Sequence, residues 1–446
     1  MHAVRHVWKV QPGSTLSGVA YIHGNKNSAL PCVAASVILP VGSSIRLTNV
    51  PRISDVDTMC EILAVYGIMS EWTGDASVIL TRTAYPPESP VLPPELASRI
   101  RGSIVLLGAL ATQYRSFRIS KPGGDRIGGR PITAHLTALE DLGFQIQDDI
   151  AELSVQRQGD DFRDGTVVLI EQSVTATLML LLYSACLGPG QHLTIIDAAC
   201  EPHVVTLCML LESLGARIQG MYSNVLTVIW PRGVRPGTVA MRLDDDFMEA
   251  ATYAIAAAIT RSAIDIPFQN ASLYLQVIDR YLGWMGVRTE LTTNLWRVDG
   301  AASDLIVRPG MSVIKAEPWP RFPTDVMSVA VVLATQCTGT IRFVEYMYDD
   351  RFGFVQSLRD MGAMIDLQPP HAVIVRGPAR LRSNELFLRP DIRSGAAMLI
   401  AALAADGTSI LHDHRNVIAR GYQNLPQSLA SLGARITELQ SPFGSS

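Results

Sequence analysis

The sequence has few charged residues, few cysteines and no hydrophobic run of transmembrane length. Charged residues make up 17% of the chain, and the net charge is -4. This balance argues against nucleic acid as the main partner, because a phosphate-binding surface normally needs a basic excess. The most apolar run, residues 176–187, is shorter than the roughly 20 residues that cross a bilayer. We therefore expect no membrane partner.

The spacing of the six cysteines argues against two further classes of protein. None of them forms a C-x-x-C pair, and none lies beside paired histidines. A disulfide framework and a zinc site are both disfavoured by this pattern. The N-terminal segment MHAVRHVWKV also lacks the apolar core of a signal peptide. These features predict a cytoplasmic protein with reduced thiols and no metal.

What the chain does have is length and apolar content. It has 446 residues, 48% of them hydrophobic, which is enough to form more than one core. A helix-like segment that ends in an apolar residue plus glycine recurs six times, and successive glycines are 76, 72, 71, 76 and 71 residues apart. Glycine at this place typically ends a helix, and a strand follows it. The six glycines are Gly67, Gly143, Gly215, Gly286, Gly362 and Gly433.

A second helix precedes each of these segments and is richer still in Ala and Leu. Because these helices are apolar almost all round, we expect them to be buried on most faces. Short β-rich runs follow them, so the repeat is α-β-α-β-β and about 72 residues long. Six copies most simply form two α/β domains of three repeats each. The expected buried helices cover residues 26–38, 101–111, 173–187, 246–260, 324–336 and 393–405.

These buried helices open with polar residues, and three of those are cations. Ser, Thr, Asp and Asn often cap helices, but Lys26, Arg101 and Arg393 oppose the helix dipole. Cations are tolerated there when an anion binds the same helix end. The pattern therefore predicts an anion-binding site.

The motif GNKNSALP at residues 24–31, together with the six repeats, resembles the enolpyruvyl transferase superfamily. The resemblance covers nearly the whole chain and is nearest to the UDP-N-acetylglucosamine 1-carboxyvinyltransferase branch. Its other markers, in chain order, are RGSI (101–104), PGG-x-x-I-G-x-RP (122–131), FPTD (322–325), DRF (350–352), D-x-R-x-x-A (391–396) and RGY (420–422).

The resemblance implies a fold of two inside-out α/β barrels, each with three repeats, and an active site in the cleft between them. Residues 24–243 would form the first domain and include the catalytic loop. Residues 1–23 and 244–446 would form the second. The oligomeric state stays open.

The resemblance also implies a reaction. The family moves the enolpyruvyl group of phosphoenolpyruvate to a sugar hydroxyl and releases phosphate, without a metal or organic cofactor. The chemistry needs a proton donor to C3, a base at the attacking hydroxyl, and cations that hold phosphate and carboxylate. His135, His203, His412 and His414 are scattered along the chain, and we expect them to be structural.

Roles follow position by position from the family motifs. The phosphoenolpyruvate-binding cations are Lys26, Arg130 and Arg420. The other substrate-binding positions are Asn27, Arg101, Pro131, Arg351, Asp391 and Arg393. Asp325 matches the carboxylate at the acceptor hydroxyl, where it can act as base. It can also cap its helix, or do both.

The glycine-rich stretch KPGGDRIGGRP, residues 121–131, contains Asp125 where most family members carry a cysteine. Aspartic acid occurs there naturally in some members, and it can donate the proton when the loop closes over the site. Fosfomycin alkylates the family's loop thiol, so we expect resistance to it. The alternative is that Asp125 is a solvated loop residue.

The sequence departs from the family where the acceptor's uracil and diphosphate bind. After the loop, Thr133 and Ala134 replace an acid and a leucine. Leu169 replaces a lysine, and Glu171 replaces a serine. A glutamate beside a diphosphate is electrostatically unfavourable.

Two more acceptor positions also differ. Ser173 replaces a glycine, and Ala419 replaces the acid before Arg420. These losses concern the acceptor, whereas the residues matched to phosphoenolpyruvate are kept. We therefore expect a retained reaction with an altered acceptor, such as the uridine monophosphate used by nikkomycin- and polyoxin-type enzymes. UDP-N-acetylglucosamine in a rearranged site, or an inactive ligand-binding homologue, remains open.

Overall fold

The structure is a computed structural model that describes residues 6–86, 91–125 and 127–439. The chain divides into two compact units. The first unit comprises the described residues of 24–124 and 131–244, and the second comprises those of 1–23, 125–130 and 245–446. Each unit has its own hydrophobic core. The sequence places the whole glycine-rich loop in the first domain, whereas residues 125 and 127–130 group with the second unit.

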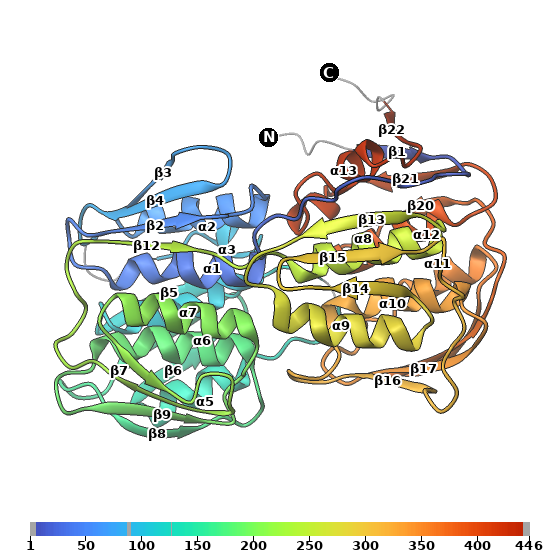
Figure 1. Cartoon of the computed structure of the whole chain (residues 1–446). Coiled ribbons are helices and arrows are strands. Elements are labelled where there is room, and N and C mark those ends of the chain that lie inside the picture. Colours follow the sequence, from blue (N-terminus) through green and yellow to red (C-terminus); the bar gives the residue numbers. More distant parts are fainter. Residues whose placement is uncertain (1–5, 87–90, 126, 440–446) are drawn as a thin grey trace, which may run out of the picture. The chain divides into compact units, whose positions relative to one another are not determined.

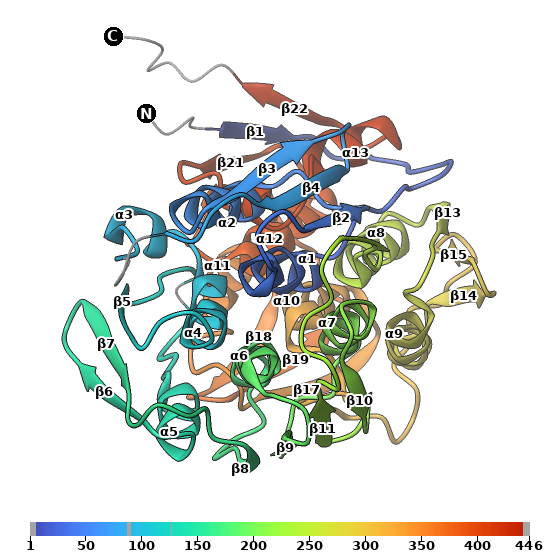
Figure 2. The ribbon, with the colours of Figure 1, turned by 90° about the vertical axis from the view of Figure 1, so that its left-hand side faces the viewer.

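In the first unit, helices lie inside and strands lie around them, as Figure 2 shows. Its helices are α1 (Lys26–Ala34), α2 (Ser54–Val65), α3 (Pro94–Ala97), α4 (Leu106–Ala111), α5 (Thr133–Asp141), α6 (Val174–Tyr183) and α7 (Pro202–Ser213). Its strands are β2 (Ser44–Thr48), β3 (Ile68–Trp72), β4 (Ser77–Arg82), β5 (Ser116–Ser120), β6 (Phe144–Asp148), β7 (Glu152–Arg157), β8 (Gly165–Val168), β9 (His192–Ile196), β10 (Arg217–Gln219), β11 (Val225–Ile229) and β12 (Thr238–Arg242). They form the sheets β12-β2-β4-β3, β5-β7-β6 and β10-β11-β9-β8.

The second unit repeats this plan (Figure 1). Its helices are α8 (Phe247–Ile259), α9 (Ser272–Trp284), α10 (Thr324–Gln336), α11 (Val355–Asp360), α12 (Ile392–Leu403) and α13 (Leu425–Ser431). Its strands are β1 (His6–Val10), β13 (Ala263–Pro267), β14 (Arg288–Leu291), β15 (Leu295–Asp299), β16 (Val313–Ala316), β17 (Gly339–Glu345), β18 (Met364–Gln368), β19 (Ala372–Gly377), β20 (Glu385–Phe387), β21 (Ser409–Asp413) and β22 (Ile436–Leu439). They form the sheets β13-β15-β14, β16-β17-β19-β18 and β20-β21-β1-β22.

The six repeats read from the sequence are present. All six glycines have positive φ, between 74° and 114°, and each is followed by a strand. The sixth repeat takes its last strand from the other end of the chain, because β1 pairs antiparallel with both β21 and β22. Four of the six sheets gain an extra strand that pairs in parallel: β12 with β2, β8 with β9, β16 with β17, and β20 with β21.

The central helices are buried because their sequences offer no polar face. Every residue of α8 and of α12 is buried. Fully burying one leucine or isoleucine contributes roughly 1.5–3 kcal/mol. The two helices together carry six such residues, and alanine fills most of the rest. Small residues also let the helices approach closely: a Cβ on Gly108 of α4 would lie 1.9 Å from the carbonyl oxygen of Met179 on α6.

Three expected helices are partly 3-10: those of residues 26–38 and 173–187 at their ends, and that of residues 101–111 at its start. The segment 101–111 begins as a 3-10 turn, Arg101–Val105, and becomes α-helical only at Leu106. This turn packs against α1, where a Cβ on Gly102 would lie 2.8 Å from the Leu30 side chain. Arg101 therefore sits in a tight turn rather than at an α-helix terminus. Among the described residues, no helix combines the length and apolar character needed to cross a membrane.

Candidate functional site

In the second unit, Asp325 lies between two buried arginines. It is the second residue of α10, whose N-cap position is Pro323, so Asp325 does not cap the helix. Its Oδ1 accepts a hydrogen bond of 2.9 Å from Nη2 of Arg351, and its Oδ2 accepts one of 3.2 Å from Nη2 of Arg393. The arginine side chains are 2% and 4% exposed, whereas Asp325 is 24% exposed. Its carboxylate is thus the accessible member of a buried charge cluster.

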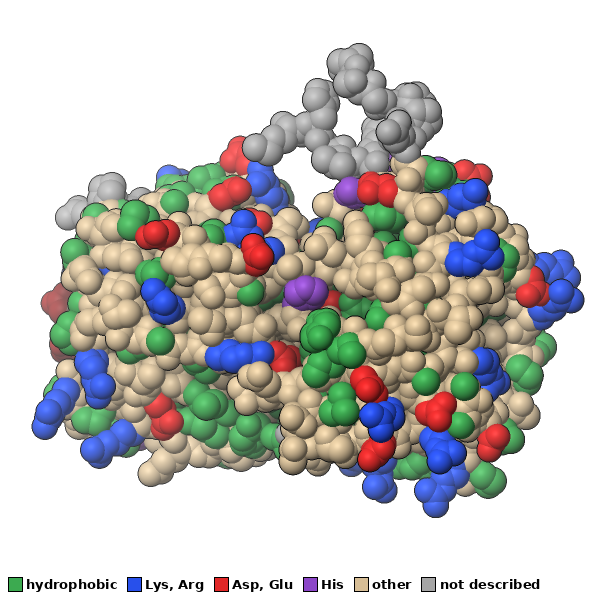
Figure 3. Space-filling view, turned by 45° about the horizontal axis from the view of Figure 1, so that its top comes forward, with side chains coloured by type: hydrophobic (Ala, Val, Ile, Leu, Met, Phe, Trp, Pro, Cys, Tyr) green, Lys and Arg blue, Asp and Glu red, His purple; other side chains and the backbone are tan. Residues whose placement is uncertain are grey.

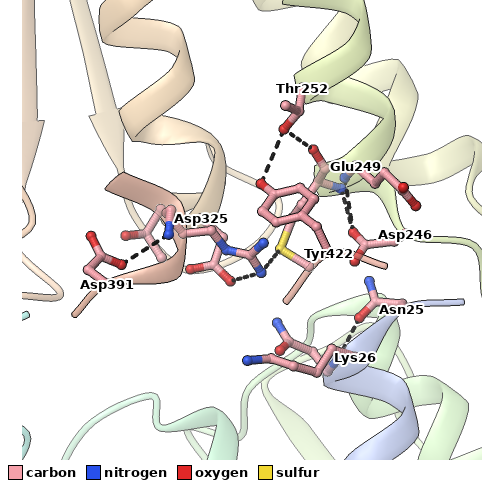
Figure 4. Close-up of polar contacts among 12 residues, drawn as sticks. Asn25, Lys26, Asp246, Glu249, Thr252, Asp325, Asp391 and Tyr422 are labelled. Carbon is pink, nitrogen blue, oxygen red and sulfur yellow. Dashed lines mark hydrogen bonds and ion pairs between the residues drawn. The ribbon is translucent and has the colours of Figure 1, made fainter. Parts of the chain in front are cut away.

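Asp391 completes this cluster. It caps α12, where its oxygens accept hydrogen bonds from the backbone N–H groups of Arg393 and Ser394. Its Oδ1 also lies 3.5 Å from Nη1 of Arg351. Asp391 is therefore paired both with its helix terminus, a contact that Figure 4 marks, and with the Arg351 cation.

Charge pairing sets the pKa values in this cluster. Burial alone would lower the pKa of Arg351, but Asp325 and Asp391 outweigh it and raise that pKa. Burial would also lower the pKa of Arg393, but the nearby Asp325, Tyr422 and Asp246 outweigh that effect and raise it. Burial raises the pKa of Asp391, and the positive charge of Arg351 offsets part of that rise. Both arginines are therefore held as cations.

A polar group at the start of α8 borders Arg393. Asp246 caps α8 by accepting hydrogen bonds from the N–H groups of Met248 and Glu249. Burial raises the pKa of Asp246 to about 7, although Arg393 opposes the shift. The hydroxyls of Thr252 and Tyr422 lie 3.2 Å apart (Figure 4). Tyr422 belongs to the RGY motif read from the sequence, but only the structure shows that its ring centre lies 5.3 Å from the guanidinium carbon of Arg393.

The glycine-rich loop also contributes to the second unit. Nη1 of Arg420 donates a hydrogen bond of 2.6 Å to Oδ1 of Asp125, and both side chains are mostly buried. The guanidinium of Arg130 lies 5.4 Å from the ring centre of Tyr348. Asp125 also raises the pKa of Asp391, so the loop and the charge cluster interact electrostatically. Arg126 of this loop lies outside the described residues.

In the first unit, Lys26 and Asn27 open α1. Asn25 is the N-cap, and its side chain accepts hydrogen bonds from the N–H groups of Asn27 and Ser28. Nζ of Lys26 lies 3.0 Å from Oδ2 of Asp55, and their side chains are 12% and 5% exposed. Lys26 is thus a nearly buried cation at a helix N-terminus, which is the arrangement expected for an anion site.

Arg101 and Pro131 are also brought together in this unit, where Nη2 of Arg101 donates a hydrogen bond of 3.1 Å to the Pro131 carbonyl oxygen. Close by, His135 is buried in α5, and its Nε2 lies 2.9 Å from the hydroxyl oxygen of Thr175. Burial and, to a lesser degree, Arg101 lower the pKa of His135 to about 3. The imidazole is therefore neutral, and its Nδ1 has no hydrogen-bond partner.

Five of the six positions where the family's acceptor contacts are missing lie near the starts of α5 and α6 in the first unit. Thr133 is exposed at the first turn of α5, and Ala134 is buried behind it. Leu169 is buried after β8, whereas Glu171 is exposed just before α6. Ser173, the N-cap of α6, accepts a hydrogen bond from Ala176 N–H. Ala419 lies in the second unit, in the 3-10 turn before Arg420.

Five of the six cysteines are buried, and Cys186 is half-buried. Within the described residues, all six cysteines are free, and no group of histidine, cysteine and acidic residues could hold a metal. Burial raises the pKa of Cys200 to about 11 and those of Cys186, Cys208 and Cys337 to about 12. On the face shown in Figure 3, basic and acidic side chains are interspersed rather than gathered into a patch of one sign.

Comparison with known proteins gives consistent results. A family model described as EPSP synthase (3-phosphoshikimate 1-carboxyvinyltransferase) matches residues 10–429. The UDP-N-acetylglucosamine 1-carboxyvinyltransferase of Bradyrhizobium diazoefficiens is 36% identical over 439 residues, covering 96% of each chain. The protein of the same name from Treponema pallidum is 36% identical over 444 residues, covering 96% of this chain and 98% of the relative.

Solved structures show the same fold. The enolpyruvyl transferase NikO from Streptomyces tendae superposes with a TM-score of 0.83 at 22% identity, and covers 98% of this chain and 100% of its own. EPSP synthase from Acinetobacter baumannii superposes with a TM-score of 0.73 at 14% identity, with the same coverage. The α/β fold class predicted from the repeats and the resemblance is therefore confirmed.

Proposed function

Because the chain belongs to the EPSP synthase family of carboxyvinyl transferases, we propose that it transfers the enolpyruvyl group of phosphoenolpyruvate to a hydroxyl of a uridine nucleotide. The acceptor proposed is UMP-like, and phosphate is the second product. Family membership confirms the transferase class expected from the sequence. The choice of acceptor and the role of each residue are our proposals.

The observation that carries the proposal is the position of Asp325 between Arg351 and Arg393. A carboxylate fixed on both oxygens by buried cations keeps a defined orientation, yet it remains partly accessible. Such a group can take the proton of an acceptor hydroxyl as that oxygen attacks C2 of phosphoenolpyruvate. The arginines then stabilise the negative charge that develops nearby.

Asp125 is the proposed proton donor to C3. In the present structure its carboxylate is paired with Arg420, a cation that we assign to phosphoenolpyruvate. The two roles compete for the same guanidinium, so binding of the substrate anion to Arg420 releases Asp125 from its partner. The Asp125 carboxylate then takes a proton back from C3 as phosphate leaves C2, while Arg130 holds the anion, and the transfer is complete.

The acceptor assignment rests on what surrounds α5 and α6. Glu171 is exposed beside the N-terminus of α6, and the buried Leu169 offers no charge. A diphosphate bound there would face a carboxylate without a compensating lysine. A nucleoside monophosphate has less charge to place, which favours a UMP-like acceptor. We propose nucleoside-antibiotic synthesis in the cytoplasm as the setting.

UDP-N-acetylglucosamine is the alternative acceptor. Two relatives named UDP-N-acetylglucosamine 1-carboxyvinyltransferase are 36% identical to this chain over nearly its whole length. Binding of this acceptor in a rearranged diphosphate site is therefore a specific competing hypothesis. A homologue that binds ligand without turnover is the third possibility. Retention of Lys26, Arg130 and Asp325 argues against it.

Phosphate release from phosphoenolpyruvate separates these three possibilities. The full chain is incubated with phosphoenolpyruvate and either UMP, UDP-N-acetylglucosamine or no acceptor, with Asp325→Asn as the inactive control. Release with UMP supports the proposal, and mass spectrometry of the nucleotide product should show an added enolpyruvyl group. Release only with UDP-N-acetylglucosamine would overturn the acceptor assignment. No release with either would favour a binding protein.

A further inference from the structure

A short segment of the second unit, residues 346–350, packs against the glycine-rich loop. It links β17 to the turn before α11. The N–H of Asp350 donates a hydrogen bond of 3.0 Å to the carbonyl oxygen of Ile127. Gly128 has a φ of +103°, and a Cβ there would lie 2.9 Å from both Asp349 Cβ and Asp350 N. The loop backbone and this segment therefore fit together at van der Waals distance.

Tyr348 is the central side chain of this contact. Its ring centre lies 5.4 Å from the guanidinium carbon of Arg130 and 4.8 Å from that of Arg351. Both distances are within the range in which a cation is attracted to an aromatic face. Arg351 in turn holds Asp325 through the 2.9 Å hydrogen bond described above. One half-buried ring thus contacts the loop arginine and an arginine of the charge cluster.

The segment is itself held from both ends. At its start, the buried carboxylate of Glu345 accepts a hydrogen bond of 2.7 Å from Met347 N–H and another from the hydroxyl of Thr324. At its end, Asp350 forms an ion pair with Arg389. These contacts restrict the backbone on either side of Tyr348. The ring is therefore presented by a fixed support rather than by a free loop.

We propose that Tyr348 is a positioning residue for phosphoenolpyruvate binding. Its ring holds the guanidinium of Arg130 in place while the loop that carries Arg130 is docked. The inference rests on the proposed function in one respect, namely that Arg130 binds the substrate anion. Arg130 has a long, flexible side chain, and an aromatic face limits its rotamers before the substrate arrives. Pre-ordering of this kind lowers the cost of binding without a new contact to the substrate.

The kinetic test compares Tyr348→Leu, Tyr348→Phe and Tyr346→Leu in the full chain. Tyr348→Leu should raise the KM for phosphoenolpyruvate roughly 3- to 30-fold and leave the acceptor KM within about twofold, since it removes the aromatic face. Tyr348→Phe keeps the aromatic ring and should therefore have the wild-type KM for phosphoenolpyruvate. Tyr346 is the matched control, because it is 64% exposed on the same segment and its ring lies beside His371. Equal effects of the two leucine variants would overturn the proposal.

A second readout does not depend on turnover. Amide hydrogen exchange over residues 127–130 should be faster in Tyr348→Leu than in Tyr346→Leu, because the loop loses its contact with the Tyr348 ring. If it is faster but no acceptor is converted, the proposed function fails while the docking role stands. If exchange is unchanged in an active enzyme, the docking role is wrong. Tyr348→Met keeps the bulk without the aromatic face and replaces the leucine variant if that variant does not fold.

Discussion

Arg420 donates a 2.6 Å hydrogen bond to Asp125, although 295 positions separate the two residues in the chain. The carboxylate that stands in place of the family's usual loop thiol is thus bound to a cation in the second unit. Both side chains are less than one-fifth exposed, so solvent screens the pair only weakly. Asp125 is therefore not the solvated loop residue that the sequence left as an alternative.

Replacement of Asp125 should separate its acid chemistry from its charge pairing. Asp125→Asn keeps the size of the side chain but cannot give up a proton, so kcat should fall roughly 10²- to 10⁴-fold. Asp125→Cys again supplies a side chain that can donate a proton as the neutral thiol, so it should regain activity. Arg420 beside it favours the thiolate form, which is the form that fosfomycin alkylates. Mass spectrometry should detect covalent labelling by fosfomycin of Asp125→Cys only. Labelling of the wild-type chain at this loop would contradict our expectation of resistance.

Asp325→Asn should retain the fold and lose most of the activity. Asparagine can still face Arg351 and Arg393, but it cannot take the acceptor's proton, and we expect kcat to fall roughly 10²- to 10⁴-fold. Steady-state kinetics together with a thermal melt check this. Asp366→Asn is the control, because Asp366 forms an exposed ion pair with Arg376 and should tolerate the change within about twofold. More than half of wild-type activity in Asp325→Asn would rule Asp325 out as the base.

His135 should make the first unit sensitive to acid. Its pKa is about 3 in the folded chain against 6.5 for an unperturbed imidazole, so below pH 6.5 the unfolded state binds the proton and the folded state does not. Stability is therefore lost as pH falls from 6.5 toward 3, by at most about 1.4 kcal/mol per pH unit.

The comparison of wild type with His135→Gln at pH 7.5 and pH 5 checks this sign. The variant should lose less stability on acidification than the wild type, as measured by denaturant unfolding at each pH. His192→Gln is the control, because the His192 ring is about half exposed on β9 of the same unit. An equal acid response in wild type and His135→Gln would show that His135 does not set the sensitivity.

Gly128→Ala should impair the loop more than a glycine substitution in an open position. The added methyl group would sit 2.9 Å from Asp350 N, in a backbone conformation that also disfavours a side chain. We expect kcat/KM for phosphoenolpyruvate to fall about tenfold or more, since Arg130 follows two residues later. Gly159→Ala carries a similar backbone strain at φ +82° with nothing within 4 Å, so it should leave kcat/KM nearly unchanged. Equal kinetics for the two variants would argue against close docking at Gly128.

Local patterns made the fold readable from the sequence. The six glycines end their helices with positive φ, and the Ala-rich segments are buried, because both properties follow from residues within a few positions of one another. The residue types of the site were also predictable, since Lys26, Asp325 and Arg393 are charged residues at the starts of otherwise apolar helices. The 3-10 turn at Arg101 was not, because packing against α1 shapes it.

By itself, then, the sequence determined the repeats, the buried helices, the family and the residue types of the candidate site. Only the tertiary structure decided how those residues pair: Asp325 with two arginines instead of a helix cap, Asp125 with Arg420, and Arg130 against Tyr348. The physical reason is range. Helix ends and apolar stripes are specified by neighbours along the chain, whereas an ion pair or a cation on an aromatic ring joins segments that come together only when the chain is folded.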